Sequence, residues 1–194
     1  MPQLLIKGTA NFQMDITFGI EKSPFGIILG GESKKGLCFI SIGHNEEKLS
    51  AALFAHFPTG IIKRNDDQLK PSLQVLVAYL NNDPCNKKLL LDIHGTLFQR
   101  TVWKSLTTIP SGETRSYSEL ADKIGKPKAC RAVGSACGKN PLALVFPCHR
   151  VIGKNGDLTG FRWGKTIKQA LLNSERIVSS LTVNANWINK QSFS

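Results

Sequence analysis

The sequence PCHRVIGK at residues 147–154 places a cysteine directly before a histidine and an arginine. Cysteine reacts as the thiolate, which a neighbouring imidazole or cation favours. Pro147 fixes its own φ and lacks a backbone N–H, so this run does not lie in the interior of an ordinary helix. A lone cysteine in an apolar strand would be read as inert packing, but His149 and Arg150 are expensive to bury without partners. The run therefore predicts that Cys148 is a reactive thiol.

A resemblance to a known family rests on this run and on four further segments that follow the family's order. The segments are GTLFQRTVW at 95–103, IPSGETRSY at 109–117, PKACRAVG at 127–134 with Asn140-Pro141, and GFRWG at 160–164. Together they resemble the O6-alkylguanine-DNA alkyltransferases, or methylated-DNA–protein-cysteine methyltransferases, which move an alkyl group from guanine O6 in DNA onto one of their own cysteines. The match is strong over about residues 92–176 and weaker over about 14–80. The last segment resembles the bacterial branch, including the C-terminal half of the adaptive-response regulator.

Local patterns in the first part of the chain predict a small α/β unit. Three short segments are rich in β-branched or aromatic residues and are broken by glycine or proline, as strands are. Asn45 can cap one helix, and Pro71 can open another at its first position. The expected strands are residues 14–18, 25–29 and 37–42, and the expected helices are residues 46–57 and 71–80.

The second part of the chain is expected to be mostly helical. Thr96 with Gln99, and Ser116 with Glu119, have the spacing of capping boxes, which begin helices. Two short helices across the turn at Gly125 form a helix-turn-helix pattern, which together with basic charge indicates DNA binding. The expected helices are residues 96–107, 116–125, 127–137 and 166–176.

The fold class and the domain boundaries follow from these elements. We expect an α/β protein with an N-terminal α/β domain at residues 1–88 and a C-terminal alkyltransferase domain that binds DNA at residues 89–180. Residues 83–88 are the expected linker, and residues 181–194 are an expected tail. The family resemblance implies that the N-terminal sheet is antiparallel and ribonuclease-H-like.

Positive charge is concentrated in the second half of the chain. Residues 1–92 hold 10 Lys or Arg against 9 Asp or Glu, a net charge of +1. Residues 93–194 hold 15 against 5, a net charge of +10. Because the excess lies in the half that carries Cys148, it favours a polyanionic partner whose phosphates bind cations.

Composition argues against several other classes of protein. No apolar run approaches a membrane span, and the first residues do not resemble a signal peptide, so we expect an intracellular, cytoplasmic protein. The five cysteines are an odd number without Cys-x-x-Cys spacing, which suits reduced thiols better than disulfides or a metal site. We expect a monomer with no cofactor, no metal and no membrane partner.

The resemblance implies a set of catalytic residues around Cys148, the proposed acceptor. His149 would take the thiol proton through a bridging water, and Glu175 would orient His149. Tyr117 would protonate the guanine as the alkyl group leaves, and Asn140 would brace the cysteine loop. By residue type alone, each of these three residues has a plainer interpretation. Glu175 could be a solvated charge on a helix, Tyr117 a partly buried aromatic ring, and Asn140 a turn residue.

The resemblance also implies how DNA is held. Guanine O6 lies inside a stacked duplex, so the base must be flipped out before it reacts. Arg131 would replace the flipped nucleotide, although by residue type it could be a simple phosphate contact. Small residues beside it would let the helix approach the minor groove closely. The expected DNA-binding residues are Ser116, Tyr117, Lys128, Arg131, Ala132 and Gly134, and the expected alkyl and guanine pocket residues are Cys137, Val151, Phe161 and Arg162.

These residues favour a DNA-repair protein that irreversibly transfers an alkyl group from O6-alkylguanine to Cys148, once per molecule. Whether O4-alkylthymine also reacts stays open. The first alternative is a transcriptional regulator that senses damage with the same cysteine; it is less expected because no cysteine-rich metal module precedes the first strand. A lesion-binding protein without transfer would lack Cys148, and a cysteine hydrolase would lack the DNA-binding pattern. The bulk of Phe161, Arg162 and Trp163 favours small alkyl groups.

The uneven charge leads to a prediction about DNA affinity. Binding to duplex DNA should be weakly dependent on sequence and should weaken steeply with salt, by roughly one unit of log affinity per unit of log salt for each phosphate contact. A fluorescence titration between low and moderate salt measures this slope. Affinity that does not change with salt would contradict the prediction.

Overall fold

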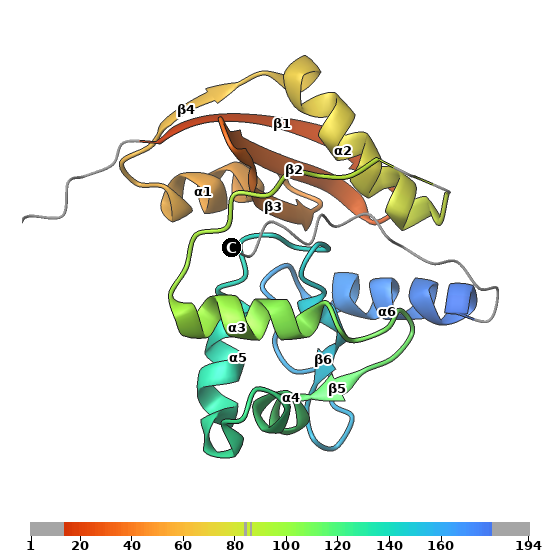
Figure 1. The fold of residues 1–194 in the computed structure, drawn as a ribbon. Coiled ribbons are helices and arrows are strands. Elements are labelled where there is room, and N and C mark those ends of the chain that lie inside the picture. Colours follow the sequence, from red (N-terminus) through yellow and green to blue (C-terminus); the bar gives the residue numbers. More distant parts are fainter. Residues whose placement is uncertain (1–13, 84, 86, 180–194) are drawn as a thin grey trace, which may run out of the picture.

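The computed structural model describes residues 14–83, 85 and 87–179 (Figure 1). Within them, a mixed sheet with two helices is followed by a mostly helical part, as the α/β expectation requires. The expected tail at 181–194 lies outside the described residues. The elements are β1 (Asp15–Ser23), β2 (Gly26–Ser33), β3 (Gly36–Gly43), α1 (Glu46–His56), β4 (Ile61–Arg64), α2 (Asp66–Asn81), α3 (Leu97–Leu106), β5 (Arg115–Ser116), α4 (Tyr117–Lys123), the 3-10 turn η1 (Pro127–Ala129), α5 (Cys130–Gly138), the 3-10 turn η2 (Cys148–Arg150), β6 (Val151–Ile152) and α6 (Lys165–Ser179).

The main sheet has the strand order β3-β2-β1-β4. Strands β1, β2 and β3 pair antiparallel, so the three strands expected from the sequence are confirmed, each longer than predicted. The expectation of an antiparallel sheet is wrong for β4, which runs parallel to β1 and was not predicted. The four residues of β4 are mostly exposed. They therefore carry no buried apolar pattern by which a strand could be recognised.

Helices α1 and α2 cover opposite faces of this sheet. Neighbouring strand residues point to opposite faces, and accordingly Ile28 packs in one apolar cluster with α2 whereas Leu29 packs in another with α1. Two glycines let α2 lie close to the strands. A Cβ at Gly19 would lie 2.8 Å from Leu69 Cβ, and one at Gly30 would lie 2.6 Å from Leu73 Cδ2.

The start of α2 differs from the sequence prediction. The helix begins at Asp66 rather than at Pro71, because the Asn65 side chain caps it by accepting from the Gln68 N–H at 3.1 Å. Pro71 lies in the second turn, where its missing N–H removes one backbone hydrogen bond. The cap, together with two acidic residues in the first turn, favours helix through that position.

The other expected helices are confirmed. Asn45 caps α1, and both capping boxes are formed, at the start of α3 and at the start of α4. Gly125, with φ at 71°, follows α4 in the left-handed conformation that suits a helix end. The helix expected at 127–137 is divided into η1 and α5, and the last helix, α6, runs three residues beyond its expected end at 176.

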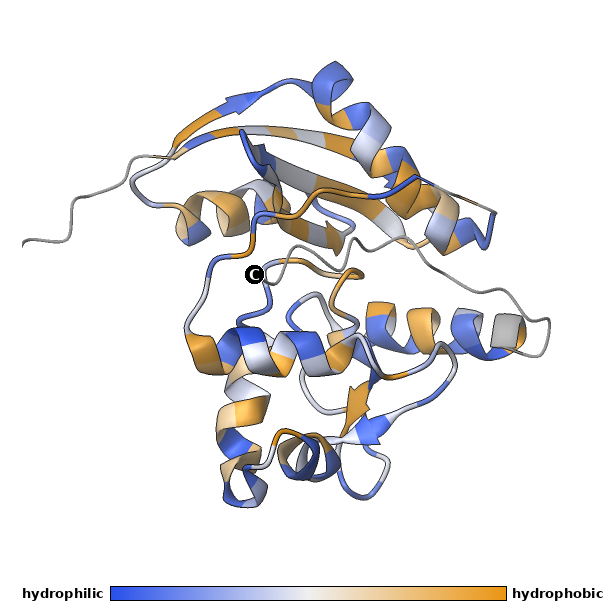
Figure 2. Ribbon diagram, viewed as in Figure 1, coloured by the Kyte–Doolittle hydropathy of each residue, from blue (hydrophilic) through white to orange (hydrophobic). Residues whose placement is uncertain are grey.

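The second half of the chain is docked on the outer edge of β3. Leu37 exchanges backbone hydrogen bonds with the segment ahead of α3, through Leu90 and Asp92, each at 2.9 Å. Ile40 does the same with the segment after α5: its N–H donates to Pro141 O at 2.7 Å, and its carbonyl accepts from Ala143 N. Figure 2 shows hydrophobic residues along the strands and in this segment after α5, and residues 141–147 are all buried.

The largest apolar cluster is shared by both halves. It joins residues of β2, β3 and α2 to residues of α3, α4, α5 and α6. Trp103 in α3 lies near its centre, where its ring stacks on Phe146 and its Nε1–H donates to the Ala136 carbonyl at 2.8 Å. Among the described residues, no helix has the length and apolar composition needed to cross a bilayer.

Candidate active site

Cys148 opens the short turn η2, between the buried segment 141–147 and β6. The residue is only 8% exposed. Asn140, itself buried, donates from Nδ2 to Cys148 Sγ at 3.1 Å and to the Phe146 carbonyl at 2.8 Å. Its Oδ1 accepts from the Leu142 N–H at 3.0 Å. Asn140 therefore links the thiol to the loop that leads to it.

The surroundings of Cys148 act on its ionisation in both directions. Burial raises the pKa of the thiol, because a thiolate loses its hydration there. The hydrogen bond from Asn140 and the positive charges of Lys168 and Arg162 oppose that rise without cancelling it. Lys168 is itself fully buried, and its Nζ donates to the Val151 carbonyl. The thiol at rest is therefore protonated and needs a base.

His149 lies next to the thiol in sequence but turns one ring nitrogen toward α6. Its Nε2 is 2.8 Å from Glu175 Oε1, and the residue is 1% exposed. Because an ionised carboxylate can only accept, Nε2 carries a proton, and in a neutral imidazole Nδ1 is then the acceptor. Nδ1 is buried and has no hydrogen-bond partner within the described part of the chain.

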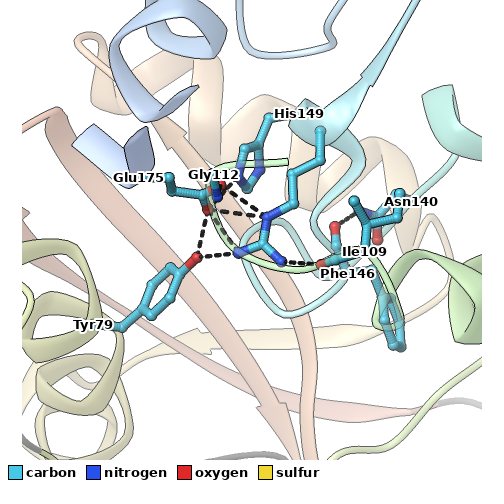
Figure 3. A network of polar contacts seen from close by, with 8 residues as sticks. Tyr79, Ile109, Gly112, Asn140, Phe146, His149 and Glu175 are labelled. Atoms are coloured by element: carbon cyan, nitrogen blue, oxygen red, sulfur yellow. Dashed lines mark hydrogen bonds and ion pairs between the residues drawn. The ribbon is translucent and has the colours of Figure 1, made fainter. Parts of the chain in front are cut away.

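Glu175 is the centre of a buried polar network (Figure 3). Arg150 donates to it from Nε, at 2.9 Å to Oε2, and from Nη2, at 2.7 Å to Oε1, while Arg150 Nη1 binds the Ile109 carbonyl at 2.6 Å. The Tyr79 hydroxyl donates to Oε1 at 2.8 Å, and the Gly112 N–H reaches Oε2 at 3.3 Å. Burial alone would raise the pKa of Glu175, but the hydrogen bonds and charges of His149 and Arg150 hold it well below its usual value. Glu175 is therefore ionised at neutral and mildly acidic pH.

Tyr117 is the first residue of α4, and its half-buried side chain lies between two other elements. Its hydroxyl accepts from Thr159 Oγ1 at 3.1 Å, and its ring lies against Gly134 of α5, where an added Cβ would be 3.7 Å away. Burial raises the pKa of the phenol, and the hydrogen bond from Thr159 opposes that rise. The hydroxyl proton is thus free to be donated elsewhere.

The expected DNA-binding residues fall into two groups. Lys128, Arg131 and Ala132 are exposed on η1 and the first turn of α5. Ser116 differs, because it is buried and its hydroxyl is engaged with the Glu119 carboxylate and backbone in the capping box of α4. Its side chain holds the start of α4.

Three of the four expected pocket residues pack in or against the apolar cluster that contains Cys148, and the fourth, Arg162, packs on aromatic rings. Cys137 and Val151 are buried in the same apolar cluster as Cys148, and Phe161 packs against it with its ring 6.5 Å from that of His149. The Arg162 guanidinium lies elsewhere, over the rings of Trp163 at 4.7 Å and of Phe39 in β3 at 5.8 Å. The side chain of Arg162 therefore anchors this loop to the sheet.

Four polar residues of the site were not identified from the sequence: Tyr79, Arg150, Thr159 and Lys168. Arg150 had a local signal, because it follows His149 directly. The others are brought in by tertiary packing, and their sequence neighbours carry no motif. Within the described residues, no group of three or more His, Cys, Asp or Glu comes together that could hold a metal ion.

The arrangement defines a class of protein by its chemistry. A buried thiol, an imidazole with one free nitrogen and a carboxylate that orients the imidazole are the parts of an activated cysteine nucleophile. They stand on a mostly helical unit whose α4, η1 and α5 expose basic residues.

Comparison with known proteins places the chain within this class. Residues 97–177 match the family described as 6-O-methylguanine DNA methyltransferase, DNA binding domain. The inducible methylated-DNA–protein-cysteine methyltransferase of Bacillus subtilis is 43% identical over 147 residues, which are 75% of this chain and 82% of that protein. The structure of the Mycobacterium tuberculosis OGT in complex with DNA superposes with a TM-score of 0.69 at 37% identity, covering 83% of this chain and 93% of that one.

The chain therefore belongs to the family of methylated-DNA–protein-cysteine methyltransferases. A further relative, the regulatory protein ada of Salmonella typhimurium, is 42% identical over 162 residues, or 84% of this chain. The match covers 46% of that protein, so the chain spans slightly less than half its length.

The network around Glu175 leads to a prediction about stability and pH. The pKa of Glu175 is depressed in the folded protein, so the carboxylate contributes stability above its usual value near 4.5, and this contribution is lost as the pH falls further. Glu175→Gln leaves the Arg150 charge buried without its counter-charge and should lower the free energy of unfolding by about 3 kcal/mol at pH 7. This gap should shrink between about pH 5 and pH 2, as urea unfolding at several pH values will show.

Glu113→Gln serves as the matched control, because Glu113 pairs with Arg115 on the surface. Its effect on unfolding should be small at every pH, since exposed ion pairs contribute about 0–1 kcal/mol. A Glu175→Gln deficit that stays constant as the pH falls would show that the carboxylate charge is not what stabilises the fold.

Proposed function

We propose that this protein repairs DNA by transferring an alkyl group from O6-alkylguanine to its own Cys148, in a single, irreversible turnover. The observation that carries the proposal is the buried Cys148, braced by Asn140 beside the His149–Glu175 pair, in a chain of this family. Its relatives are named methylated-DNA–protein-cysteine methyltransferases. O4-alkylthymine is a second candidate substrate of the same site.

The proposed transfer begins with ionisation of the thiol. Nδ1 of His149 takes the proton from Cys148 through a bridging water, and the ionised Glu175 stabilises the resulting imidazolium. The sulfur attacks the alkyl carbon, a C–S bond forms, and the bond from that carbon to O6 breaks with its electron pair left on guanine. The product thioether is not readily displaced, so Cys148 is not regenerated.

Tyr117 is proposed to supply the proton that the leaving guanine needs. Its hydroxyl accepts a hydrogen bond from Thr159, which favours the phenolate formed after donation and leaves its own proton free. Cys137, Val151 and Phe161 are proposed to line the alkyl and guanine pocket, with Arg162 contributing its backbone. Small alkyl groups fit such a packed wall best.

DNA binding is proposed to use α4, η1 and α5 as a helix-turn-helix that enters the minor groove. Lys128 and Arg131 are exposed there, and Ala132 and Gly134 add little bulk, which supports close approach to the duplex. Arg131 would replace the flipped base, with Tyr117 crowding the target nucleotide. Ser116 would act indirectly, by holding the start of α4.

We further propose the boundaries expected from the sequence, a ribonuclease-H-like domain at 1–88 and an alkyltransferase domain at 89–180, acting as a monomer. Pairing of β1, β2 and β3 in consecutive antiparallel order supports the first assignment. The apolar cluster that both halves share supports a fixed relation between them.

A second candidate is a damage-sensing regulator. Similarity to the Salmonella protein, which is named a regulatory protein, favours it. Such a protein would bind one operator sequence much more tightly than random DNA. Competition between random and selected duplexes separates the two candidates.

The proposed acceptor can be tested directly. After incubation with duplex DNA that carries O6-methylguanine, peptide mass spectrometry should find one methyl group on Cys148 and none on the other four cysteines. Cys148→Ala should abolish transfer and still bind DNA, because the thiol is buried and the exposed basic residues of η1 and α5 are unchanged. A methyl group on Cys130 or Cys137 would overturn the assignment.

The proposed role of Arg131 separates base flipping from chemistry. Arg131→Ala should slow repair of duplex DNA roughly tenfold or more, because unstacking a base costs a few kcal/mol and each 1.4 kcal/mol is a factor of ten. Reaction with free O6-methylguanine should be unaffected, since nothing has to be extruded. Lys139→Ala, which removes an exposed cation beyond the end of α5, is the control for lost charge. Equal losses on both substrates would assign Arg131 another role.

A further inference from the structure

Tyr79 stands at the junction between the two halves of the chain. It belongs to α2, yet its hydroxyl lies in the network around Glu175 of α6 (Figure 3). It donates to Glu175 Oε1 at 2.8 Å and accepts from Arg150 Nη2 at 3.0 Å. Among the described residues ahead of α3, Tyr79 is the one whose side chain forms hydrogen bonds with Glu175 and Arg150.

The two bonds of Tyr79 affect the oxygen that faces the imidazole. Glu175 Oε1 receives three kinds of donor, from His149 Nε2, Arg150 and the Tyr79 hydroxyl. Each donor draws on the same negative charge, so the share available to His149 depends on the other two. Burial and the Glu175 charge raise the pKa of Tyr79, so its hydroxyl stays protonated and remains a donor.

Tyr79 also accepts a hydrogen bond from Arg150 that would otherwise be available to Glu175. Nη2 is shared between Glu175 Oε1 and the Tyr79 oxygen, while Nη1 is held by the Ile109 carbonyl. The guanidinium is therefore held by three residues, Ile109, Tyr79 and Glu175, and only part of its hydrogen bonding goes to the carboxylate.

We propose that Tyr79 is a positioning residue for alkyl transfer, which sets how Glu175 shares its charge between His149 and Arg150. The proposal rests on the proposed function, because it assigns His149 the role of base. Under this proposal, the N-terminal half contributes a residue that affects the rate of the reaction, in addition to supporting the fold. Tyr79 touches neither the thiol nor the substrate, so it acts through Glu175.

Tyr79→Phe tests this by removing one oxygen and keeping the ring. With one donor fewer, Oε1 attracts the imidazolium more strongly, so at a given pH a larger fraction of His149 is already protonated and cannot accept the proton of Cys148. The rate of methyl transfer from duplex DNA should fall about tenfold near neutral pH. The acid limb of the pH–rate profile should move to higher pH, and the rates should converge at alkaline pH. DNA affinity should not change.

Two further variants separate positioning from stability. Ser33→Ala removes the hydrogen bond from Ser33 to Asp92, at 2.6 Å, which joins β2 to the segment ahead of α3 and lies outside the network. Its pH–rate profile should match that of the parent protein. Tyr79→Phe added to Glu175→Gln should cause no further loss, because the charge it modulates is already gone. An unchanged profile in Tyr79→Phe, or losses that multiply in the double variant, would overturn the proposal.

A second measurement covers the case in which Tyr79→Phe does not fold. Replacing tyrosine by 3-fluorotyrosine labels both tyrosines of the chain, and Tyr117→Phe assigns the two ¹⁹F resonances. The Tyr79 resonance should titrate with the same midpoint as the acid limb of the transfer rate, and absence of that titration would contradict the coupling. Transfer by the unaltered protein is measured first: absence of transfer would reject the proposed function and the role of Tyr79 with it, whereas normal transfer without the ¹⁹F titration would reject the Tyr79 proposal alone.

Discussion

The buried carboxylate of Glu175 is the constraint on which the arrangement of the site depends. Its partners come from α2, from the turn at residues 109–112 and from η2, while Glu175 itself stands on α6. Taking the charges of Glu175 and Arg150 out of water is expensive, and their attraction offsets it only when the geometry is good and the remaining donors are satisfied. Removal of either charge would leave the other buried without its counter-charge, which is strongly destabilising. Four segments that are distant in the sequence must be in place together before His149 has its final orientation.

The outer edge of β3 supplies the frame for that assembly. It binds the backbone ahead of α3 through Leu37 and the backbone after α5 through Ile40. The second of these segments leads from Asn140 to Cys148, so its hydrogen bonds to β3 help to determine the position of the thiol. The side chains of β3 are buried on both faces, in the apolar cluster with α2 on one side and in the cluster with α1 on the other, so the strand is held between the two helices. Within the described residues, the strands of this sheet contribute no side chain to the network around Glu175, yet their edge determines the position of η2.

What could be predicted from the sequence was local. The caps at Asn45, Thr96 and Ser116 were identified because each bond joins residues three apart. Cys148 and His149 were identified because the motif is contiguous, and Glu175 only through the family resemblance. Pro71 was misread because a favourable cap six residues earlier, at Asn65, outweighed its local signal, and β4 was missed because its residues are mostly exposed. Tyr79 could not be found at all, since its partners lie 71 and 96 residues away and nothing near it marks a buried hydroxyl.

Burial of the Cys148 thiol limits when it can react. A buried cysteine is protonated at rest, because burial raises its pKa more than Asn140, Lys168 and Arg162 lower it. An exposed thiolate would react with any electrophile, and in the proposed reaction each molecule can react only once. A thiol that is ionised only by a base held in a fixed orientation reacts when substrate, base and carboxylate are aligned. Burying Glu175 and Arg150 costs free energy, but it ties the orientation of His149 to the completed fold. This contributes to the selectivity of Cys148 for its substrate over other electrophiles.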